Sequence, residues 1–203
     1  GRSFGRCHPG ASRPSDIADR LLINAGNGYF SVESARRMSA VMLESSCGMK
    51  VVIVDMNGDG KLDILKDDAL NAPQGISISF NDTATEGVFG TYDVIYNNAP
   101  YHFDIGDLNN DNLPDMIVSD DGQDRYILNQ LATPGQVPVP FSPTIAFTYS
   151  GGGGDDGFGG NNLIADLDND GWNDALIVRI SLSCWRATIR RVVKLPPSRV
   201  RST

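Results

Sequence analysis

The chain has 203 residues, 40% of them hydrophobic and 21% charged, which is typical of a globular protein and excludes a disordered or fibrous one. No apolar run reaches the roughly 18 residues that a membrane-spanning helix needs, so no membrane insertion is expected. The formal net charge of −8 argues against nucleic acid as a partner, because clustered Lys and Arg side chains bind a phosphate backbone.

The charge divides the chain into three parts. Residues 1–14 contain three arginines and no acid, and residues 179–203 contain seven Lys or Arg and no acid. The body, residues 15–178, is therefore strongly acidic. Two interpretations of the basic ends stay open: an arm for an anionic surface, or sequence foreign to the protein, such as out-of-frame translation. The second is favoured, because a repeat register is lost at the same two places.

In chain order, the first predicted element is a partial repeat at residues 19–30. The segment Asp19-Arg20-Leu21-Leu22-Ile23-Asn24 matches the residues at 124–129, Asp-Arg-Tyr-Ile-Leu-Asn, and the turn Gly26-Asn27-Gly28 follows it. Extended backwards, this alignment places Gly10 where an acidic residue should stand. The repeat is therefore interrupted where the N-terminal basic segment lies.

Three acidic loops follow, each with the pattern D-x-[DN]-x-D-x-x-x-D: loop one (residues 55–63), loop two (107–115) and loop three (166–174). Their starts lie 52 and 59 residues apart, which indicates a repeated supersecondary unit. Short apolar segments precede the loops at 51–54, 103–106 and 163–165, and others follow at 64–65, 116–118 and 175–178. Apolar β-branched runs on both sides of a polar turn predict strand, loop, strand.

Side-chain oxygens at positions 1, 3 and 5 of such a loop converge on one point, together with the position-7 carbonyl and the position-9 Asp. Hard oxygen ligands in this arrangement suit Ca²⁺. The predicted ligands are Asp55, Asn57, Asp59, the carbonyl of Lys61 and Asp63 in loop one; Asp107, Asn109, Asp111, the carbonyl of Leu113 and Asp115 in loop two; and Asp166, Asp168, Asp170, the carbonyl of Trp172 and Asp174 in loop three. About three Ca²⁺ sites are therefore expected.

Residue types at other loop positions refine this interpretation. Position 6 is Gly60, Asn112 or Gly171, the residue types that best accept a positive φ. An EF-hand would need Glu at position 12, where this chain has Lys66, Val118 and Ile177. The alternative to a metal site is a solvated acidic turn. Three copies disfavour it, because their crowded carboxylates repel one another unless cations neutralise them.

These motifs resemble FG-GAP/VCBS repeats, the calcium-binding blades of integrin-α-like β-propellers. The resemblance covers about residues 15–178 and rests on the acidic loops and on the segment from Asp19 to Phe30. It implies an all-β fold, a partial β-propeller of about three to four four-stranded blades with calcium in the loops between strands. A complete propeller has more blades, so the module is expected to need further blades from its parent chain.

The resemblance also implies an extracellular or cell-surface module for recognition or adhesion, with a protein or glycan ligand contacting loops such as 82–100 and 131–161. Two alternatives stay open: the propeller part of a secreted polysaccharide-acting enzyme, and a purely structural spacer. No catalytic constellation is recognisable, and His102 is the sole imidazole in the body. We therefore predict binding without catalysis.

Overall fold

The computed structural model describes residues 19–43, 48–68, 75–98, 100–120, 123–147, 158–180 and 187–193. The N-terminal basic segment 1–14 lies outside these residues, as does most of the tail 179–203. Within the described part no helix is long and apolar enough to cross a membrane.

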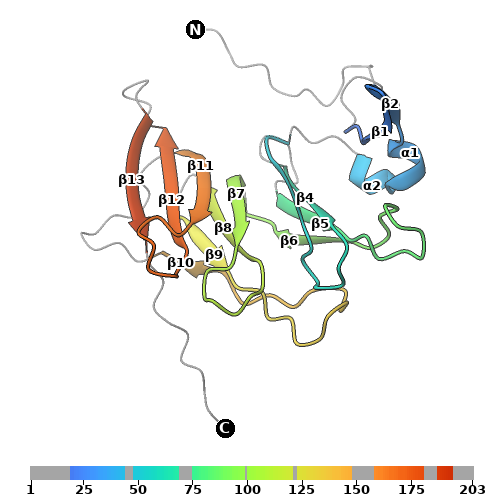
Figure 1. Ribbon diagram of the computed structural model, residues 1–203. Coiled ribbons are helices and arrows are strands. Elements are labelled where there is room, and N and C mark those ends of the chain that lie inside the picture. The colour runs from blue at the N-terminus through green and yellow to red at the C-terminus, as the bar shows by residue number, and fades with distance from the viewer. Residues whose placement is uncertain are drawn as a thin grey trace, which may run out of the picture.

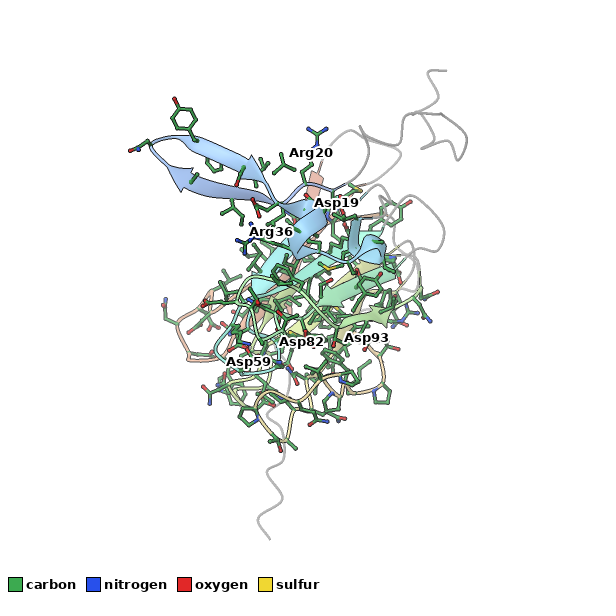
Figure 2. The ribbon with its side chains drawn as sticks, turned by 90° about the vertical axis from the view of Figure 1, so that its right-hand side faces the viewer. Asp19, Arg20, Arg36, Asp59, Asp82 and Asp93 are labelled. Carbon is green, nitrogen blue, oxygen red and sulfur yellow. The ribbon has the colours of Figure 1, made fainter. Side chains whose placement is uncertain are left out.

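The fold is built almost entirely of antiparallel strands, which confirms the predicted all-β class (Figure 1). A hairpin of β1 (Leu22–Gly26) and β2 (Tyr29–Val32) is followed by two single-turn helices, α1 (Ser34–Arg37) and α2 (Ala40–Leu43). Three larger sheets come next. The hairpin corresponds in sequence to the partial repeat, and it projects from the body of the molecule in Figure 2.

The first sheet contains β3 (Val51–Val54), β4 (Asp63–Asp68), β5 (Gly75–Ser79) and β6 (Tyr92–Tyr96), paired in chain order. The second contains β7 (Pro100–Gly106), β8 (Asp115–Asp120), β9 (Arg125–Ile127) and β10 (Ile145–Ala146), again in chain order. The third contains β11 (Phe158–Ala165), β12 (Asp174–Ile180) and β13 (Ala187–Val193). Part of the basic tail thus forms a strand that pairs with β12.

Each acidic loop joins the first strand of its sheet to the second, as the strand–loop–strand pattern predicts. The register is the same in all three: Val54 pairs with Asp63, Gly106 with Asp115, and Ala165 with Asp174. The three loops consequently lie at the same end of the sheets, the lower end in Figure 1.

The sheets stack face to face, with the second sheet between the first and the third (Figure 1). Apolar side chains fill the two interfaces. Between the first and second sheets the core includes Leu65, Ile76, Ile78, Phe103 and Met116, all fully buried. A smaller cluster between the second and third sheets contains Leu108, Ile117, Phe147, Ala175 and Ile177. Burying these faces holds the stack together.

Candidate metal centre

The acidic loops turn where the sequence predicts a positive φ. Position 6 has φ of +84° at Gly60, +65° at Asn112 and +87° at Gly171. Position 4 also has a positive φ in every loop, at Gly58, Asn110 and Asn169. Glycine and asparagine tolerate this left-handed conformation best. The turn therefore requires one of these two residue types at positions 4 and 6.

The first Asp of each loop closes the turn by accepting the backbone N–H groups of positions 5 and 6. Asp107 accepts from Asp111 at 3.2 Å and from Asn112 at 2.8 Å. Asp55 and Asp166 accept from the residues at positions 5 and 6 of their own loops in the same way, at 2.8–3.2 Å. This pattern folds the loop around its carboxylates.

The position-9 Asp is completely buried in each loop: Asp63, Asp115 and Asp174. One oxygen accepts the N–H of position 2, at 2.9 Å from Met56, 2.9 Å from Leu108 and 3.1 Å from Leu167. Burial raises the pKa of Asp63 and raises that of Asp115 to about 7. A buried anion of this kind is costly unless a cation lies beside it.

Two of the three loops gather carboxylates closely enough to share an ion. Asp107, Asp111 and Asp115 each offer an oxygen within 4.8 Å of the others, and Asp166, Asp168 and Asp174 do the same. These two triads could hold a metal ion. In loop one, Asp55, Asp59 and Asp63 do not form such a group, although the residue pattern is the same.

The second oxygen of the position-9 Asp has a backbone partner in two of the three loops. The Oδ1 atoms of Asp63 and Asp115 accept the N–H groups of Asn81 and Asn129, at 2.9 and 2.8 Å. The same atom of Asp174 is buried and has no hydrogen-bond partner in the described part of the chain. In the third sheet the position equivalent to Asn81 and Asn129, two residues after Val193, lies outside the described residues, so this oxygen does not bear on the metal. The fit to a cation rests on the donor set: the loops offer carboxylate and amide oxygens, the hard ligands that Ca²⁺ takes.

Side-chain hydrogen bonds also connect the loops to one another. The Asn129 side chain donates to the carbonyl of Met56 in loop one at 3.0 Å and to that of Pro114 in loop two at 3.3 Å. The Asn110 side chain in loop two donates to the carbonyl of Gly171 in loop three at 2.9 Å. In the opposite direction, the Asn173 side chain in loop three donates to the carbonyl of Asp107 in loop two at 2.8 Å. The shape of one loop therefore constrains its neighbours.

Two longer segments attach to loop one. In the segment after β5, Asn81 accepts from the N–H of Gly87 at 2.9 Å, and the Lys61 ammonium donates to the carbonyl of Thr83 at 3.4 Å. In the segment after β9, the N–H of Gly135 donates to the carbonyl of Asn57 at 2.7 Å. Both segments belong to the loops that the sequence predicts as contact surfaces, 82–100 and 131–161, of which residues 99 and 148–157 lie outside the described residues.

His102 lies on β7, opposite Ser119 on β8. Its side chain is half-buried, Nδ1 has no partner among the described residues, and burial lowers its pKa. The backbone carbonyl accepts a bond from the Asn162 side chain at 3.2 Å, which ties β7 to β11. The strand pairing and this bond position His102 in the sheets, as the sequence predicts.

Sequence reasoning missed the contribution of Asn81 and Asn129 to the acidic loops. Each lies just after the third strand of its sheet and satisfies the buried Asp through a backbone N–H. A signal was present for Asn129, because Asn24 ends the matching segment Asp19 to Asn24. Comparison of the chain with protein-family models and with curated protein sequences found no match.

Proposed function

We propose that this chain is a calcium-binding repeat module. The observation that carries the proposal is the pair of carboxylate triads, each completed by a fully buried position-9 Asp. Six to eight hard oxygens are what Ca²⁺ requires, and carboxylate, amide and carbonyl oxygens all occur in these loops.

Loops two and three supply the triads, and the other predicted ligands lie beside them in the same turns. Asn109 and the carbonyl of Leu113 join the set in loop two, and Asp170 and the carbonyl of Trp172 join it in loop three. Loop one, with Asp55, Asn57, Asp59, the carbonyl of Lys61 and Asp63, has the same pattern and is proposed as a third site once its carboxylates draw together around an ion.

We further propose that the sheets are blades of an FG-GAP/VCBS-like propeller. Three features favour this assignment: strands paired in chain order, an acidic loop between the first and second strands of each sheet, and face-to-face stacking of successive sheets. A propeller repeats this unit radially around an axis. The chain would then contribute about three to four blades of a larger ring.

The proposed role is recognition or adhesion outside the cell, with a protein or glycan ligand. Its support is the resemblance of the repeats and the way in which loop one anchors the segments after β5 and β9, through Thr83 and Gly135. An ion that fixes loop one would fix these segments too. Calcium would thus control ligand binding without touching the ligand.

Thermal unfolding of the full chain, in excess Ca²⁺ and in chelator, tests the calcium assignment. At about 100-fold excess over the dissociation constant, each occupied site adds roughly 2.7 kcal/mol to the free energy of unfolding. We expect a clear rise in melting temperature with Ca²⁺ and a smaller one with Mg²⁺. An identical melting temperature in Ca²⁺ and chelator would refute the proposal. Glycan-array binding that needs Ca²⁺ would support the recognition role.

A further inference from the structure

The first strands of the three larger sheets each have one edge that pairs with no other described strand. Within their sheets, β3, β7 and β11 pair only with β4, β8 and β12, so backbone groups on the other edge need different partners. Polar side chains supply two of these. Asp104 on β7 accepts the N–H of Ile164 on β11 at 3.1 Å, and the Asn162 side chain donates to the carbonyl of His102 at 3.2 Å. The free edges of β7 and β11 therefore lie side by side.

A hollow of about 470 Å³ lies beside these edges. Its lining comes from all three sheets, with Met49 and Lys50 just before β3, His102 and Asp104 on β7, and residues 160–163 on β11. Lys50 and His102 each stand five positions before their acidic loop, which at about 3.3 Å per residue places the hollow roughly 16 Å from the loops. Its volume lies in the range of about 300–1,000 Å³ that is typical of small-molecule sites.

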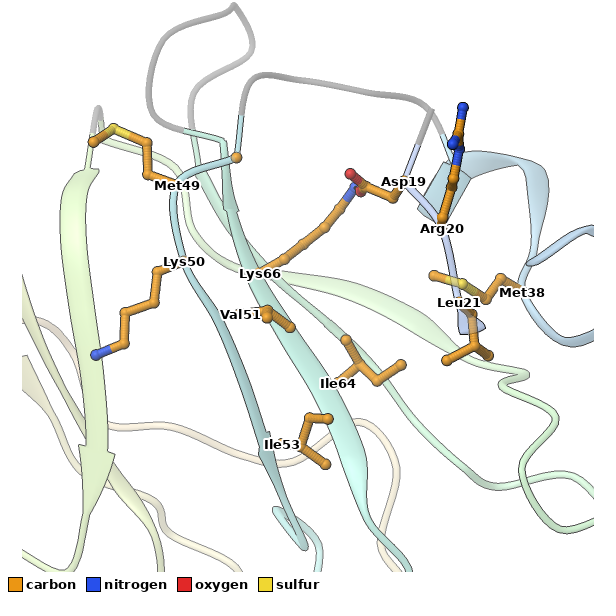
Figure 3. Close-up of a pocket in the computed structure, with 11 residues that line it drawn as sticks. Asp19, Arg20, Leu21, Met38, Met49, Lys50, Val51, Ile53, Ile64 and Lys66 are labelled. Carbon is orange, nitrogen blue, oxygen red and sulfur yellow. The ribbon is translucent and has the colours of Figure 1, made fainter. Parts of the chain in front are cut away.

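The charges that line the hollow cancel. The Lys50 ammonium donates to Oδ1 of Asp104 at 2.8 Å, and the two side chains are 21% and 17% exposed. Figure 3 shows the Lys50 side chain on the opposite side of the chain from Val51. Burial lowers the pKa of His102, so its imidazole is uncharged at pH 7. An anionic ligand would meet the Asp104 carboxylate and a cationic one the Lys50 ammonium, so the hollow favours a neutral ligand.

Two polar atoms of the lining have no hydrogen-bond partner in the described part of the chain. They are Oδ1 of Asn162, a residue that is 4% exposed, and Nδ1 of His102. An amide oxygen only accepts, whereas the ring nitrogen of a neutral imidazole either donates or accepts. A hydroxyl group suits both, because it has one donor and two acceptor positions. Since buried polar groups are nearly always satisfied, these atoms indicate a ligand rich in hydroxyl groups.

We propose that this hollow, which we name the inner-edge site, binds a neutral sugar residue. Hydroxyl groups of the sugar bond to His102 and Asn162, and the ion pair beside them offers a further donor and acceptor. The C–H groups of the sugar ring pack on Met49 and Leu163, which are 50% and 49% exposed. All three sheets contribute, so the site exists only when they are stacked. The inference deepens the proposed recognition role, on which it rests, and involves no acidic-loop residue.

Saturation-transfer difference NMR of the full chain in calcium buffer tests this inference. The neutral probes are glucose, galactose and N-acetylglucosamine, and the charged probes are glucuronate, galacturonate, glucosamine and galactosamine. We expect at least one neutral sugar to bind. Its charged counterparts should bind at least about tenfold more weakly, because each meets a like charge of the ion pair.

Three variants and one control locate the site. His102→Leu removes the unpartnered nitrogen and should weaken binding of the neutral sugar by roughly tenfold, as should Asn162→Leu. His102→Asn keeps a polar atom near the position of Nδ1 and should recover part of the affinity. Tyr126→Phe is the control, because it removes a hydroxyl from a half-buried residue on β9 outside the hollow, and it should leave the affinity unchanged.

A native chain that binds no neutral sugar overturns the inference, because ordered water then suffices for the two unpartnered atoms. Equal affinity for neutral and charged sugars also contradicts it, as does an equal loss in His102→Leu and His102→Asn, which would indicate a packing role. Sugar binding that His102→Leu leaves unchanged would refute this site and leave the recognition role standing. Far-UV circular dichroism checks folding, and the two His102 variants decide the matter if Asn162→Leu unfolds. Calcium binding, measured on the same samples, separates a failure here from a failure of the calcium proposal.

Discussion

At the scale of single residues, buried aspartates dominate the chemistry of this chain. Asp63, Asp115 and Asp174 anchor the loops, and Asp67 on β4 is also fully buried. One oxygen of Asp67 accepts the N–H groups of Met49 and Lys50, at 2.6 and 2.8 Å, and the other has no partner among the described residues. Burial raises the pKa of Asp67. The ionised form is therefore less stable in the folded chain than in the unfolded one.

This shift predicts how Asp67→Asn changes stability with pH. A raised pKa favours the protonated form in the fold, so the cost of ionisation is absent below the ordinary value of 3.8 and grows as pH rises towards the folded pKa. Relative to the native chain, Asp67→Asn should be more stable at pH 8 than at pH 4. Urea denaturation at the two pH values measures this. The same difference between variant and native chain at both would contradict it.

Asn112 offers a second test at one position. Its φ of +65° is strained for most side chains, and it is exposed. Asn112→Ala should lower the free energy of unfolding by roughly 1 kcal/mol, whereas Asn112→Gly should leave it unchanged or slightly higher. Equal effects of the two substitutions in urea denaturation would show that backbone conformation does not govern this loop.

At the scale of elements, the sequence predicted the strand–loop–strand units well. Residues 51–54 form β3 as expected, because apolar periodicity and the acidic turn are local signals. It did not predict α1, α2 or the pairing of the third and fourth strands. Those depend on contacts distant in sequence, such as Asn129 with Met56, 73 residues apart. Position 4 of every loop is Gly or Asn in the sequence, but only the structure shows that this position has a positive φ.

The link made by Asn129 predicts a large effect for a small substitution. Asn129→Ala removes the donors to Met56 and Pro114 and the acceptor for the N–H of Leu131. Leaving such buried groups unsatisfied should lower the free energy of unfolding by roughly 2–3 kcal/mol. The control is Asn161→Ala. Asn161 is exposed, and among the described residues its side chain accepts only the N–H of Asn162, so the change should be less than about 0.5 kcal/mol. Comparable losses in the two variants would disprove the role of Asn129.

At the scale of the whole molecule, three sheets share one stacking geometry and carry their acidic loops at one end. Hydrogen bonds from Asn129, Asn110 and Asn173 connect those loops in series. An ion in one loop should therefore stabilise its neighbours as well as its own sheet. The composition predicted a cation as partner, and the structure contains two Asp triads, in loops two and three, that could hold a metal ion.

Calorimetric titration of Ca²⁺ into the chelator-treated full chain tests the calcium assignment most directly. We expect two or three ions bound per chain, one in each triad and a further one if loop one closes around an ion. Asp115→Ala should lower the count by one, and Asp93→Asn, a carboxylate outside the acidic loops that accepts the N–H of Val94, should leave it unchanged. A titration with no bound Ca²⁺, or a count that Asp115→Ala does not lower, would contradict the account.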